Sequence, residues 1–393
     1  MPHPNPSPME RGLKRRFIKS ITMENTVLHP SKFIDENDII SVRNTAAEAE
    51  QLGMLHPEQL RVVYKNKWFK LLVPHVYTGL QITLPDLVRL QEAISWTDGS
   101  TGWVVTLCSG AGWFGGFISP EIAYLFNDPK VCLAGSGAAG GTADITDTGY
   151  IINGTWKYAS GAHHATHITA NCIIRKNGEP VLDDGGEQLT LPFIFDKKDV
   201  RILPAWKYIG MVATGSDAFE IKNLEVAANR QFKIDPSAAI VPEPLYQYPF
   251  LQLAEATLAV NLSGLAIHFM DLCEGIFQDK IKQPRLTDGQ KVILINELDR
   301  AKNNLNLARE RFFEAVDQSW DVIEKNNAIP DQQLNMVSIT SRRLAQLARE
   351  TVDRLYPLCG LMAASTETEI NRAWRDLHTA SQHALLTFAN PEQ

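Results

Sequence analysis

The sequence predicts an α+β protein that is mainly helical, with helices first, a β-rich segment in the middle and a helical bundle at the end. Residues 84–96 (LPDLVRLQEAISW) place apolar side chains at helical spacing after a Pro-Asp start. Residues 131–235 are rich in β-branched side chains, with Gly and Asn at the expected turns. Residues 294–319 repeat small and apolar residues in steps of four and three, which is typical of a long helix in a nearly antiparallel bundle.

The composition is that of an ordinary globular protein, 44% hydrophobic and 21% charged, with a net charge of −7. This charge balance offers no basic surface for nucleic acid. Five scattered cysteines without C-x-x-C spacing predict reduced thiols and a cytoplasmic protein. No uninterrupted apolar run reaches the roughly 20 residues of a membrane span, so no membrane association is expected. The apolar segment 251–272 is expected to be a buried bundle helix, in which Gly264 lets a neighbouring helix approach closely.

We expect four segments along the chain. Residues 1–27 are Pro-rich and then basic, without the apolar region of a secretory signal. They are predicted to be a disordered extension, or to precede a start at Met23, and less plausibly to be a basic interaction arm. The remaining segments are an N-terminal helical domain (28–130), a β-rich middle domain (131–237) and a C-terminal bundle (238–393).

Residues 132–145 (CLAGSGAAGGTADI) contain three glycines at the spacing G-x-G-x-x-G. In a dinucleotide-binding fingerprint a helix follows these glycines and binds the pyrophosphate. Here the following residues predict hairpins, and no acidic residue lies between Asp147 and Glu179 to bind a ribose. The Rossmann interpretation is therefore rejected, and the small side chains need another explanation.

Residues 150–167 (YIINGTWKYASGAHHATH) gather aromatic, hydroxyl, imidazole and glycine residues in a predicted strand-turn-strand. They are compatible with a hairpin bearing surface histidines, with a metal site, or with a wall for a flat π-system to which Ser160 donates a hydrogen bond. A metal site would use His163 and His167, but their spacing aligns ligands only on a helix. We therefore expect no metal.

Residues 370–386 (INRAWRDLHTASQHALL) contain His378 and His383. On one helix, residues five apart point about 140° away from each other, so only one of the two can face a given pocket. An isolated helical histidine is more often a satisfied core or surface residue than a catalytic one.

The chain from about residue 30 to 388 resembles the acyl-CoA dehydrogenase superfamily and, within it, the oxygenase components of two-component flavin-dependent monooxygenases, such as the p-hydroxyphenylacetate and dibenzothiophene enzymes. The matching segments are DGSTGWV (98–104), GTADITDTGYIINGTWKYASG (141–161), WKYIGMVATGSD (206–217) and RAWRDLHTASQH (372–383). The resemblance implies the acyl-CoA dehydrogenase fold, with a β-barrel-like middle domain and a C-terminal four-helix bundle, assembled as a homotetramer.

The resemblance also implies a reduced flavin, FAD or FMN, delivered by a separate flavin reductase. It suggests that Ser160 hydrogen-bonds near flavin N5 and that small residues let the backbone approach the flat ring. The residues expected along the ring are Gly141, Thr142 and Ala143, with Trp156 and Tyr158 lining the same wall. Candidates for the substrate pocket are Trp113, His163 and Met362.

Two activities fit this resemblance. A dehydrogenase needs a carboxylate base, but Ala384 stands where many relatives carry it, and the alternative is Glu255, which could equally be a buried residue paired with an arginine. The monooxygenase relatives keep a histidine at the position of His383. We therefore predict a monooxygenase acting with O₂ on a small aromatic or heteroatom-bearing substrate, with His383 rather than His378 as the catalytic residue. The alternative is an acyl-CoA dehydrogenase with FAD and a Glu255 base.

Two departures from the dehydrogenase pattern favour the monooxygenase. The Arg-x-x-Phe-Gly pattern is missing from residues 288–310, and LYPLCGLMAAS (355–365) replaces the Gln-x-x-Gly-Gly-x-Gly stretch. Both departures suggest a loosely held flavin. A bundle protein that has lost flavin binding is a third interpretation.

Overall fold

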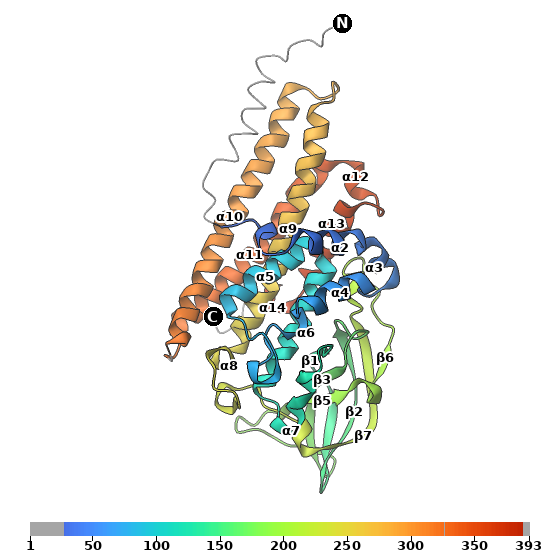
Figure 1. Cartoon of the computed structure of the whole chain (residues 1–393), viewed down its shortest axis with the longest axis vertical. Coiled ribbons are helices and arrows are strands. Elements are labelled where there is room, and N and C mark those ends of the chain that lie inside the picture. The colour runs from blue at the N-terminus through green and yellow to red at the C-terminus, as the bar shows by residue number, and fades with distance from the viewer. Residues whose placement is uncertain (1–26, 326, 388–393) are drawn as a thin grey trace.

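The computed structural model describes residues 27–325 and 327–387. Nearly all of the predicted extension (1–27) lies outside the described residues. The predicted order of helices, β-rich segment and bundle is confirmed (Figure 1). Long helices run along one end of the molecule, the sheet occupies the other end, and the N-terminal helices lie between them. The domain boundaries themselves stay predictions.

The N-terminal helices carry clear start signals. They are α2 (Glu36–Asn44), α3 (Ala46–Leu52), α4 (Pro57–Lys65), α5 (Leu84–Thr97), α6 (Gly99–Gly112) and the short α7 (Pro120–Ala123). The helix predicted at 84–96 is confirmed as α5, and its N-cap Thr83 accepts a hydrogen bond from the Asp86 amide. Asp98 then ends α5 and caps α6 by accepting from the Thr101 amide. The two helices are therefore joined without a loop.

The middle of the chain forms a seven-stranded mixed sheet with the order β4-β3-β1-β2-β7-β6, and β5 pairs with β3. The strands are β1 (Leu133–Ile145), β2 (Gly149–Ala159), β3 (His167–Lys176), β4 (Glu179–Pro180), β5 (Thr190–Asp196), β6 (Arg201–Leu203) and β7 (Asp217–Ala227). The rejection of a dinucleotide fingerprint is confirmed, because all three of its glycines lie within β1 and β1 leads into the antiparallel β2.

The glycines of β1 make room for a tryptophan. A Cβ atom at Gly141 would lie 2.4 to 2.6 Å from the Trp156 ring, and one at Gly140 would lie 2.7 Å from it. At these two positions the close neighbour is the protein's own indole. The expectation that these small residues serve a flavin ring stays a prediction.

The C-terminal part contains three long helices that pack on one another, with α13 against α9. Its helices are α8 (Pro244–Gln247), α9 (Phe250–Ile281), α10 (Asp288–Glu324), α11 (Asp331–Cys359), α12 (Leu361–Ala364), α13 (Glu369–Ala380) and α14 (Ala384–Thr387). The repeat at 294–319 is confirmed as part of α10, where Leu298, Leu305 and Phe312 are buried. A capping box between Thr287 and Gln290 starts this helix.

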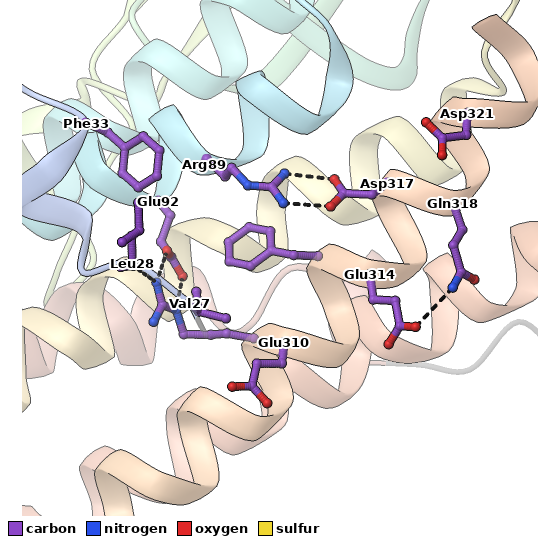
Figure 2. A pocket seen from close by; sticks show the side chains of 12 residues that line it. Val27, Leu28, Phe33, Arg89, Glu92, Glu310, Glu314, Asp317, Gln318 and Asp321 are labelled. Atoms are coloured by element: carbon purple, nitrogen blue, oxygen red, sulfur yellow. Dashed lines mark hydrogen bonds and ion pairs between the residues drawn. The ribbon is translucent and has the colours of Figure 1, made fainter. Parts of the chain in front are cut away.

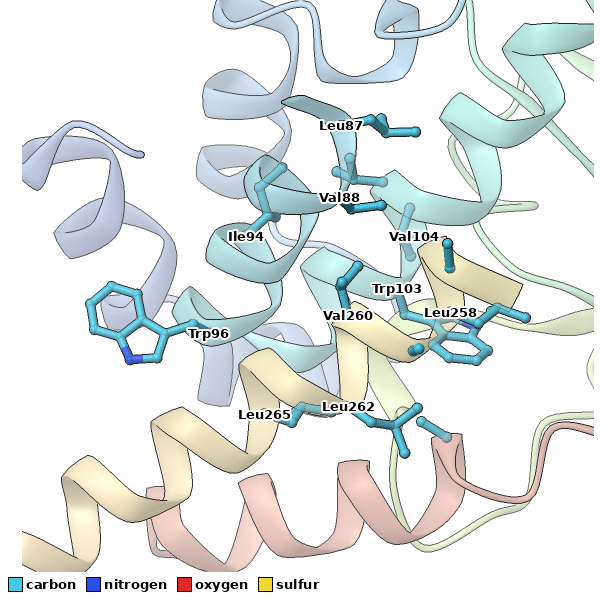
Figure 3. Close-up of a cluster of buried hydrophobic side chains, with 14 of the residues drawn as sticks. Leu87, Val88, Ile94, Trp96, Trp103, Val104, Leu258, Val260, Leu262 and Leu265 are labelled. Carbon is cyan, nitrogen blue, oxygen red and sulfur yellow. The ribbon is translucent and has the colours of Figure 1, made fainter. Parts of the chain in front are cut away.

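Helix α9 is long and apolar enough to cross a membrane, but 83% of its most apolar window is buried, so it is a core helix. A Cβ atom at Gly264 would lie 2.3 Å from the Glu92 carbonyl oxygen of α5, which confirms the predicted close approach of a neighbouring helix. Figure 3 shows the buried side chains of α5, α6 and α9 gathered between these helices, among them Val88, Val104 and Leu262.

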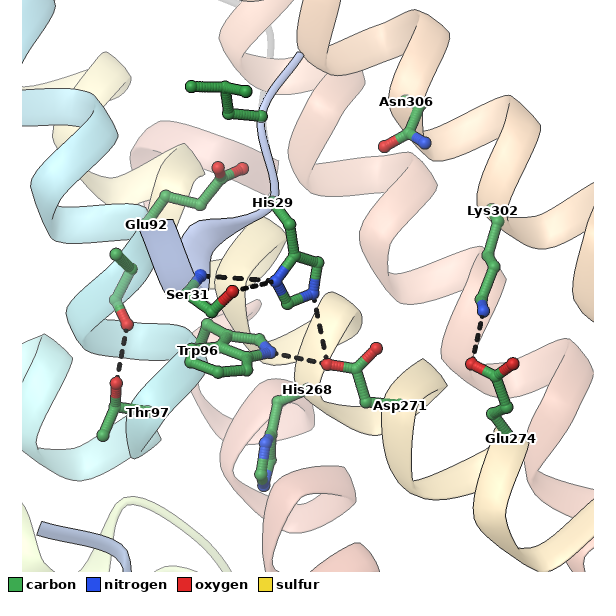
Figure 4. A network of polar contacts seen from close by, with 12 residues as sticks. His29, Ser31, Glu92, Trp96, Thr97, His268, Asp271, Glu274, Lys302 and Asn306 are labelled. Carbon is green, nitrogen blue, oxygen red and sulfur yellow. Dashed lines mark hydrogen bonds and ion pairs between the residues drawn. The ribbon is translucent and has the colours of Figure 1, made fainter. Parts of the chain in front are cut away.

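The first described residues are fixed to the bundle by polar contacts (Figure 4). Asp271 of α9 accepts a hydrogen bond from the Trp96 indole at 2.7 Å, and its carboxylate lies 3.4 Å from His29 Nε2. The Arg43 guanidinium lies over the Trp96 ring, 4.2 Å from its centroid, and hydrogen-bonds His268. The segment before α2 and the C-terminal end of α5 therefore share one anchor on α9.

Candidate active site

Three hydroxyl groups, one directly after β2 and two just before β7, form a hydrogen-bonded chain. Ser160 Oγ lies 2.7 Å from Ser216 Oγ, which lies 2.7 Å from Thr214 Oγ1. Thr214 in turn donates to the Met211 carbonyl oxygen. All three hydroxyl residues are buried. Of these three residues only Ser160 was predicted from the sequence, because Thr214 and Ser216 lie more than fifty residues further along the chain.

Trp103 connects this chain to His383. Its indole N–H donates to Ser160 Oγ at 3.2 Å, and its ring lies 6.1 Å from the His383 ring, with an interplanar angle of 60°. Ser160 and His383 are thus brought together across 223 positions of sequence by one side chain of α6. Trp103 was not predicted as a site residue, although it lies in the matching segment 98–104.

The two histidines near the C-terminus do not lie on one helix, so the predicted helical angle between them was wrong. Helix α13 ends at Ala380, and His383 lies in the turn before α14. The separation between the rings comes from this turn. His378 contacts the Trp374 carbonyl oxygen and Asp353, whereas His383 turns towards Trp103.

The environment of His383 favours a neutral ring. Its side chain is half-buried, and burial lowers the pKa of its imidazole. The Leu385 amide donates to Nδ1 at 3.4 Å. A neutral ring that accepts at Nδ1 carries its proton on Nε2, so His383 presents one N–H donor.

Trp156 and Tyr158 do not line the same wall, which corrects the prediction. Trp156 is 1% exposed, stacks on Phe219 and donates to the Asn171 carbonyl oxygen. Tyr158 is 57% exposed, and its hydroxyl lies 3.2 Å from that of Tyr208. The cause is a register shift in β2, where Tyr158 has a left-handed backbone (φ 70°) that breaks the alternation of faces.

Residues 141–143 and Ser160 lie at different places along the sheet. Gly141 pairs with Gly154, six residues before Ser160. At about 3.3 Å per strand residue this places them roughly 15–20 Å apart, farther than a single flat ring system spans. The structure therefore does not bring Gly141, Thr142 and Ala143 to the hydroxyl chain.

Of the three substrate candidates, only His163 borders this region. Its Nε2 lies 2.9 Å from Asp217, and a Cβ atom at Gly215 would lie 2.6 Å from its ring. Trp113 is 1% exposed and donates to the Leu245 carbonyl oxygen in the apolar core, so its expected place in a pocket is corrected. Met362 is exposed on α12, and the whole of α13 lies between it and His383 along the chain.

The histidines once considered as metal ligands turn to different carboxylates, His163 to Asp217 and His167 to Asp196. Within the described part of the chain, no group of three or more His, Cys, Asp or Glu residues could hold a metal ion.

Glu255 is 2% exposed and accepts a hydrogen bond from Arg342 of α11 at 2.7 Å. The interpretation as a buried residue paired with an arginine is therefore the one that the structure supports. The ion pair engages Oε1, while Oε2 is buried and has no hydrogen-bond partner among the described residues.

A separate cavity of about 500 Å³ lies between α5, α10 and residues 27–33 (Figure 2). Its wall contains the buried ion pair of Glu92 with Arg309 and the more exposed pair of Arg89 with Asp317. None of the predicted site residues lines it.

Comparison with known proteins agrees with this architecture. The family model of the acyl-CoA dehydrogenase C-terminal domain matches residues 264–388. Indole-3-acetate monooxygenase of Pseudomonas putida is 26% identical over 81% of this chain and 80% of that protein. The oxygenase subunit HsaA of a flavin-dependent monooxygenase from Rhodococcus jostii is 23% identical over 88% of this chain and 91% of that protein.

The structure of XiaF from Streptomyces, solved in complex with FADH₂ and glycerol, matches with a TM-score of 0.81. The match has 21% identity and covers 97% of this chain and 94% of that chain, and it shows the shared fold. The protein thus has the acyl-CoA dehydrogenase fold, carries an acyl-CoA dehydrogenase C-terminal domain, and is a homologue of the oxygenase components of flavin-dependent monooxygenases.

Proposed function

We propose that this chain is the oxygenase component of a two-component monooxygenase, which uses reduced flavin and O₂ to insert one oxygen atom into a small aromatic or heteroatom-bearing substrate. The observation that carries the proposal is the convergence of Ser160, Trp103 and His383. The relatives named above support the reaction class.

The chemistry of these side chains fits a flavin. Thr214 donates to the Met211 carbonyl oxygen, so Ser216 donates to Thr214 and Ser160 donates to Ser216. The Ser160 oxygen accepts from Trp103 and keeps one lone pair for an N–H at the polar edge of a flat ring, and the Trp103 indole offers an aromatic wall. When bound, the flavin supplies the activation of O₂. His383 offers its Nε2 N–H to a polar atom of the substrate, and its neutral state at pH 7 follows from its lowered pKa.

Tyr158 is the aromatic residue that we propose at the exposed rim of this site, next to Trp206 and Tyr208. We assign Gly141, Thr142 and Ala143 to a part of the cofactor remote from the ring, because the register of β1 separates them from Ser160.

We propose a separate flavin reductase as partner, a homotetrameric assembly and a cytoplasmic location. A groove between α10 and α11 supports assembly, because Leu307, Met336 and Ile339 are each about half exposed in it. Light scattering on the purified protein measures the number of subunits.

The reaction with oxygen tests the proposed function. The protein loaded anaerobically with reduced flavin is mixed with O₂, and the expected result is a transient absorbance near the violet edge of the visible. Direct re-oxidation, together with turnover of acyl-CoA substrates and a dye acceptor, would instead identify a dehydrogenase. A colourless protein whose melting temperature does not shift with oxidised or reduced flavin would identify a non-catalytic bundle protein.

The variant Ser160→Ala is expected to weaken flavin binding by about 1 kcal/mol, roughly a factor of five in Kd, because one hydrogen bond to the cofactor is lost. Fluorescence titration measures Kd with oxidised flavin, and anaerobic titration measures it with reduced flavin. Ser237→Ala on a surface turn is the control. An unchanged Kd in both oxidation states would exclude the contact.

A further inference from the structure

We propose that Asp376 of α13 is a positioning residue, which holds the Met211–Ser216 turn and thereby the hydroxyl chain that ends at Ser160. The link to flavin rests on the proposed function. The contact itself does not, since it can be measured on the protein without cofactor.

Asp376 holds the turn at its first residue. The Met211 amide donates to Asp376 Oδ1, and the Asp376 side chain is buried. The backbone next to it lies directly on α13, because a Cβ atom at Gly210 would come 2.1 Å from the Arg375 carbonyl oxygen. A buried backbone N–H needs a partner, and here the partner is a carboxylate.

The turn has a shape that needs such support. Met211 and Gly215 both have left-handed backbones, with φ of 53° and 52°, and the non-glycine Met211 is strained there. Thr214 donates to the Met211 carbonyl oxygen, and its own carbonyl oxygen accepts from the Gly161 amide at 2.9 Å. A change at Met211 is therefore passed to Ser160 through Thr214 and Ser216, and to Gly161 directly after it.

The same carboxyl group also lies against the start of α6. A Cβ atom at Gly99 would lie 3.2 Å from Asp376 Oδ2. Helix α6 carries Trp103, the hydrogen-bond donor to Ser160, and the chain that leaves α13 leads to His383. One buried carboxyl on α13, the helix that precedes His383, therefore contacts the turn that leads to Ser216 and the start of the helix that carries Trp103.

The charges around Asp376 make this contact sensitive to pH. Burial raises the pKa of Asp376 to about 7, and the neighbouring Asp98 and Glu50 act in the same direction. The Met211 amide and Arg372 act against them. Arg375 turns to Glu50 and to the Ile209 carbonyl oxygen. A cavity of about 10 Å³ lies beside the carboxyl and has room for one water. The other charged or titratable groups that line this cavity are Asp98, His268, Glu369 and Arg372. Arg43 hydrogen-bonds His268 behind them.

The sign of the pH effect follows from the raised pKa. The folded protein binds the Asp376 proton more tightly than the unfolded chain, so this group's contribution to stability is complete below about pH 4 and is lost as the pH rises through 7. Asp376→Asn cannot ionise but keeps an acceptor oxygen for the Met211 amide. It is expected to lose this part of the pH dependence.

Hydrogen exchange of the cofactor-free protein, followed by mass spectrometry on peptides that cover residues 208–217 and α13, tests the inference. Asp376→Ala is expected to speed exchange of the amides from 211 to 216 at least tenfold and to raise the Kd for reduced flavin by up to about fivefold, the loss expected when the Ser160 hydrogen bond is removed. Protection factors, which divide out the intrinsic rise of amide exchange with pH, are compared at pH 6 and pH 8. Asp376→Asn is expected to have wild-type protection at pH 6 and to lose the wild-type change in protection between pH 6 and pH 8. The matched control is Asp353→Asn, whose carboxyl contacts α13 from outside through His378.

The outcomes separate this inference from the proposed function. A wild-type protein that binds no flavin contradicts the proposed function, while faster exchange in Asp376→Ala still supports the contact. A wild type that binds flavin, with unchanged exchange and Kd in Asp376→Ala, overturns the inference. Faster exchange over all of α13, without a peak at 211–216, shows a merely structural residue and also overturns it. Where Asp376→Ala does not fold, an Asp376→Asn profile identical to the wild type between pH 6 and pH 8 overturns it.

Discussion

Replacing His383 by alanine is expected to lower product formation about 10²–10⁴-fold, the usual range for one acid–base or hydrogen-bonding group in a site. Oxygen consumption should continue and should release hydrogen peroxide, because the substrate loses its contact while Ser160 and Trp103 remain. The melting temperature should change little, since the imidazole is only half-buried. The measurement is the ratio of product formed to O₂ consumed.

The pH dependence of product formation per O₂ consumed in the wild type is a second test of the role of His383. Burial lowers the pKa of this imidazole, so the ring stays neutral to a lower pH than an ordinary histidine. On the acid side, the ratio of product formed to O₂ consumed should therefore fall only below pH 6.5. The control is His378→Ala, which loses a contact with Asp353 and should keep normal coupling. Uncoupling in His378→Ala but not in His383→Ala would assign the catalytic role to the other histidine.

Arg309→Met is expected to destabilise the protein by about 3–5 kcal/mol, because it leaves the Glu92 carboxylate buried without its cation. Glu92 is 1% exposed, and both of its oxygens accept from Arg309 at 2.7 and 2.8 Å. The free energy of unfolding is measured by chemical denaturation. The double variant Glu92→Leu with Arg309→Met should lose less than the single variant, since no unpaired charge remains.

The neighbouring ion pair in Figure 2 is the matched control. Arg89 and Asp317 have similar geometry, but their side chains are 26% and 42% exposed. Asp317→Asn should cost at most about 1 kcal/mol, because water solvates the remaining charge. Equal losses at the two pairs would show that burial is not what makes the Glu92–Arg309 pair important.

Elements with a long periodic pattern could be predicted from the sequence, and single contacts could not. The repeat of α10 and the start of α5 depend on neighbours along the chain, so they can be found by spacing. The glycines of β1 could not be interpreted in this way, because the ring that they accommodate belongs to Trp156 on the next strand. The prediction that Tyr158 lies on the same wall as Trp156 failed for a related reason. The register shift between β2 and β7 depends on the neighbouring strand and cannot be recognised in the sequence of β2 alone.

The candidate site shows the same limit. The prediction of Ser160 and His383 came from a resemblance, whereas Trp103 and Ser216 complete the group through contacts across 57 and 56 positions. No spacing rule relates residues that far apart. The helical angle predicted only that His378 and His383 cannot face one pocket, and the choice of His383 came from the resemblance. The structure instead separates the two histidines by ending the helix at Ala380.

The close contact between Gly264 of α9 and the backbone of α5 limits which segments of the chain can be exchanged between related proteins. The C-terminal family model begins at this residue, inside α9, yet the surface that Gly264 leaves open is filled by the backbone of α5, from the other end of the chain. Asn261 and Ser263 also bond to α5 residues, Ser95 and Glu92. A chimera joined at the family boundary would therefore set one parent's α5 against the other parent's α9. The packing surfaces of α5 and α9 must therefore come from the same parent, and a bundle taken from a relative must be transferred together with that relative's α5.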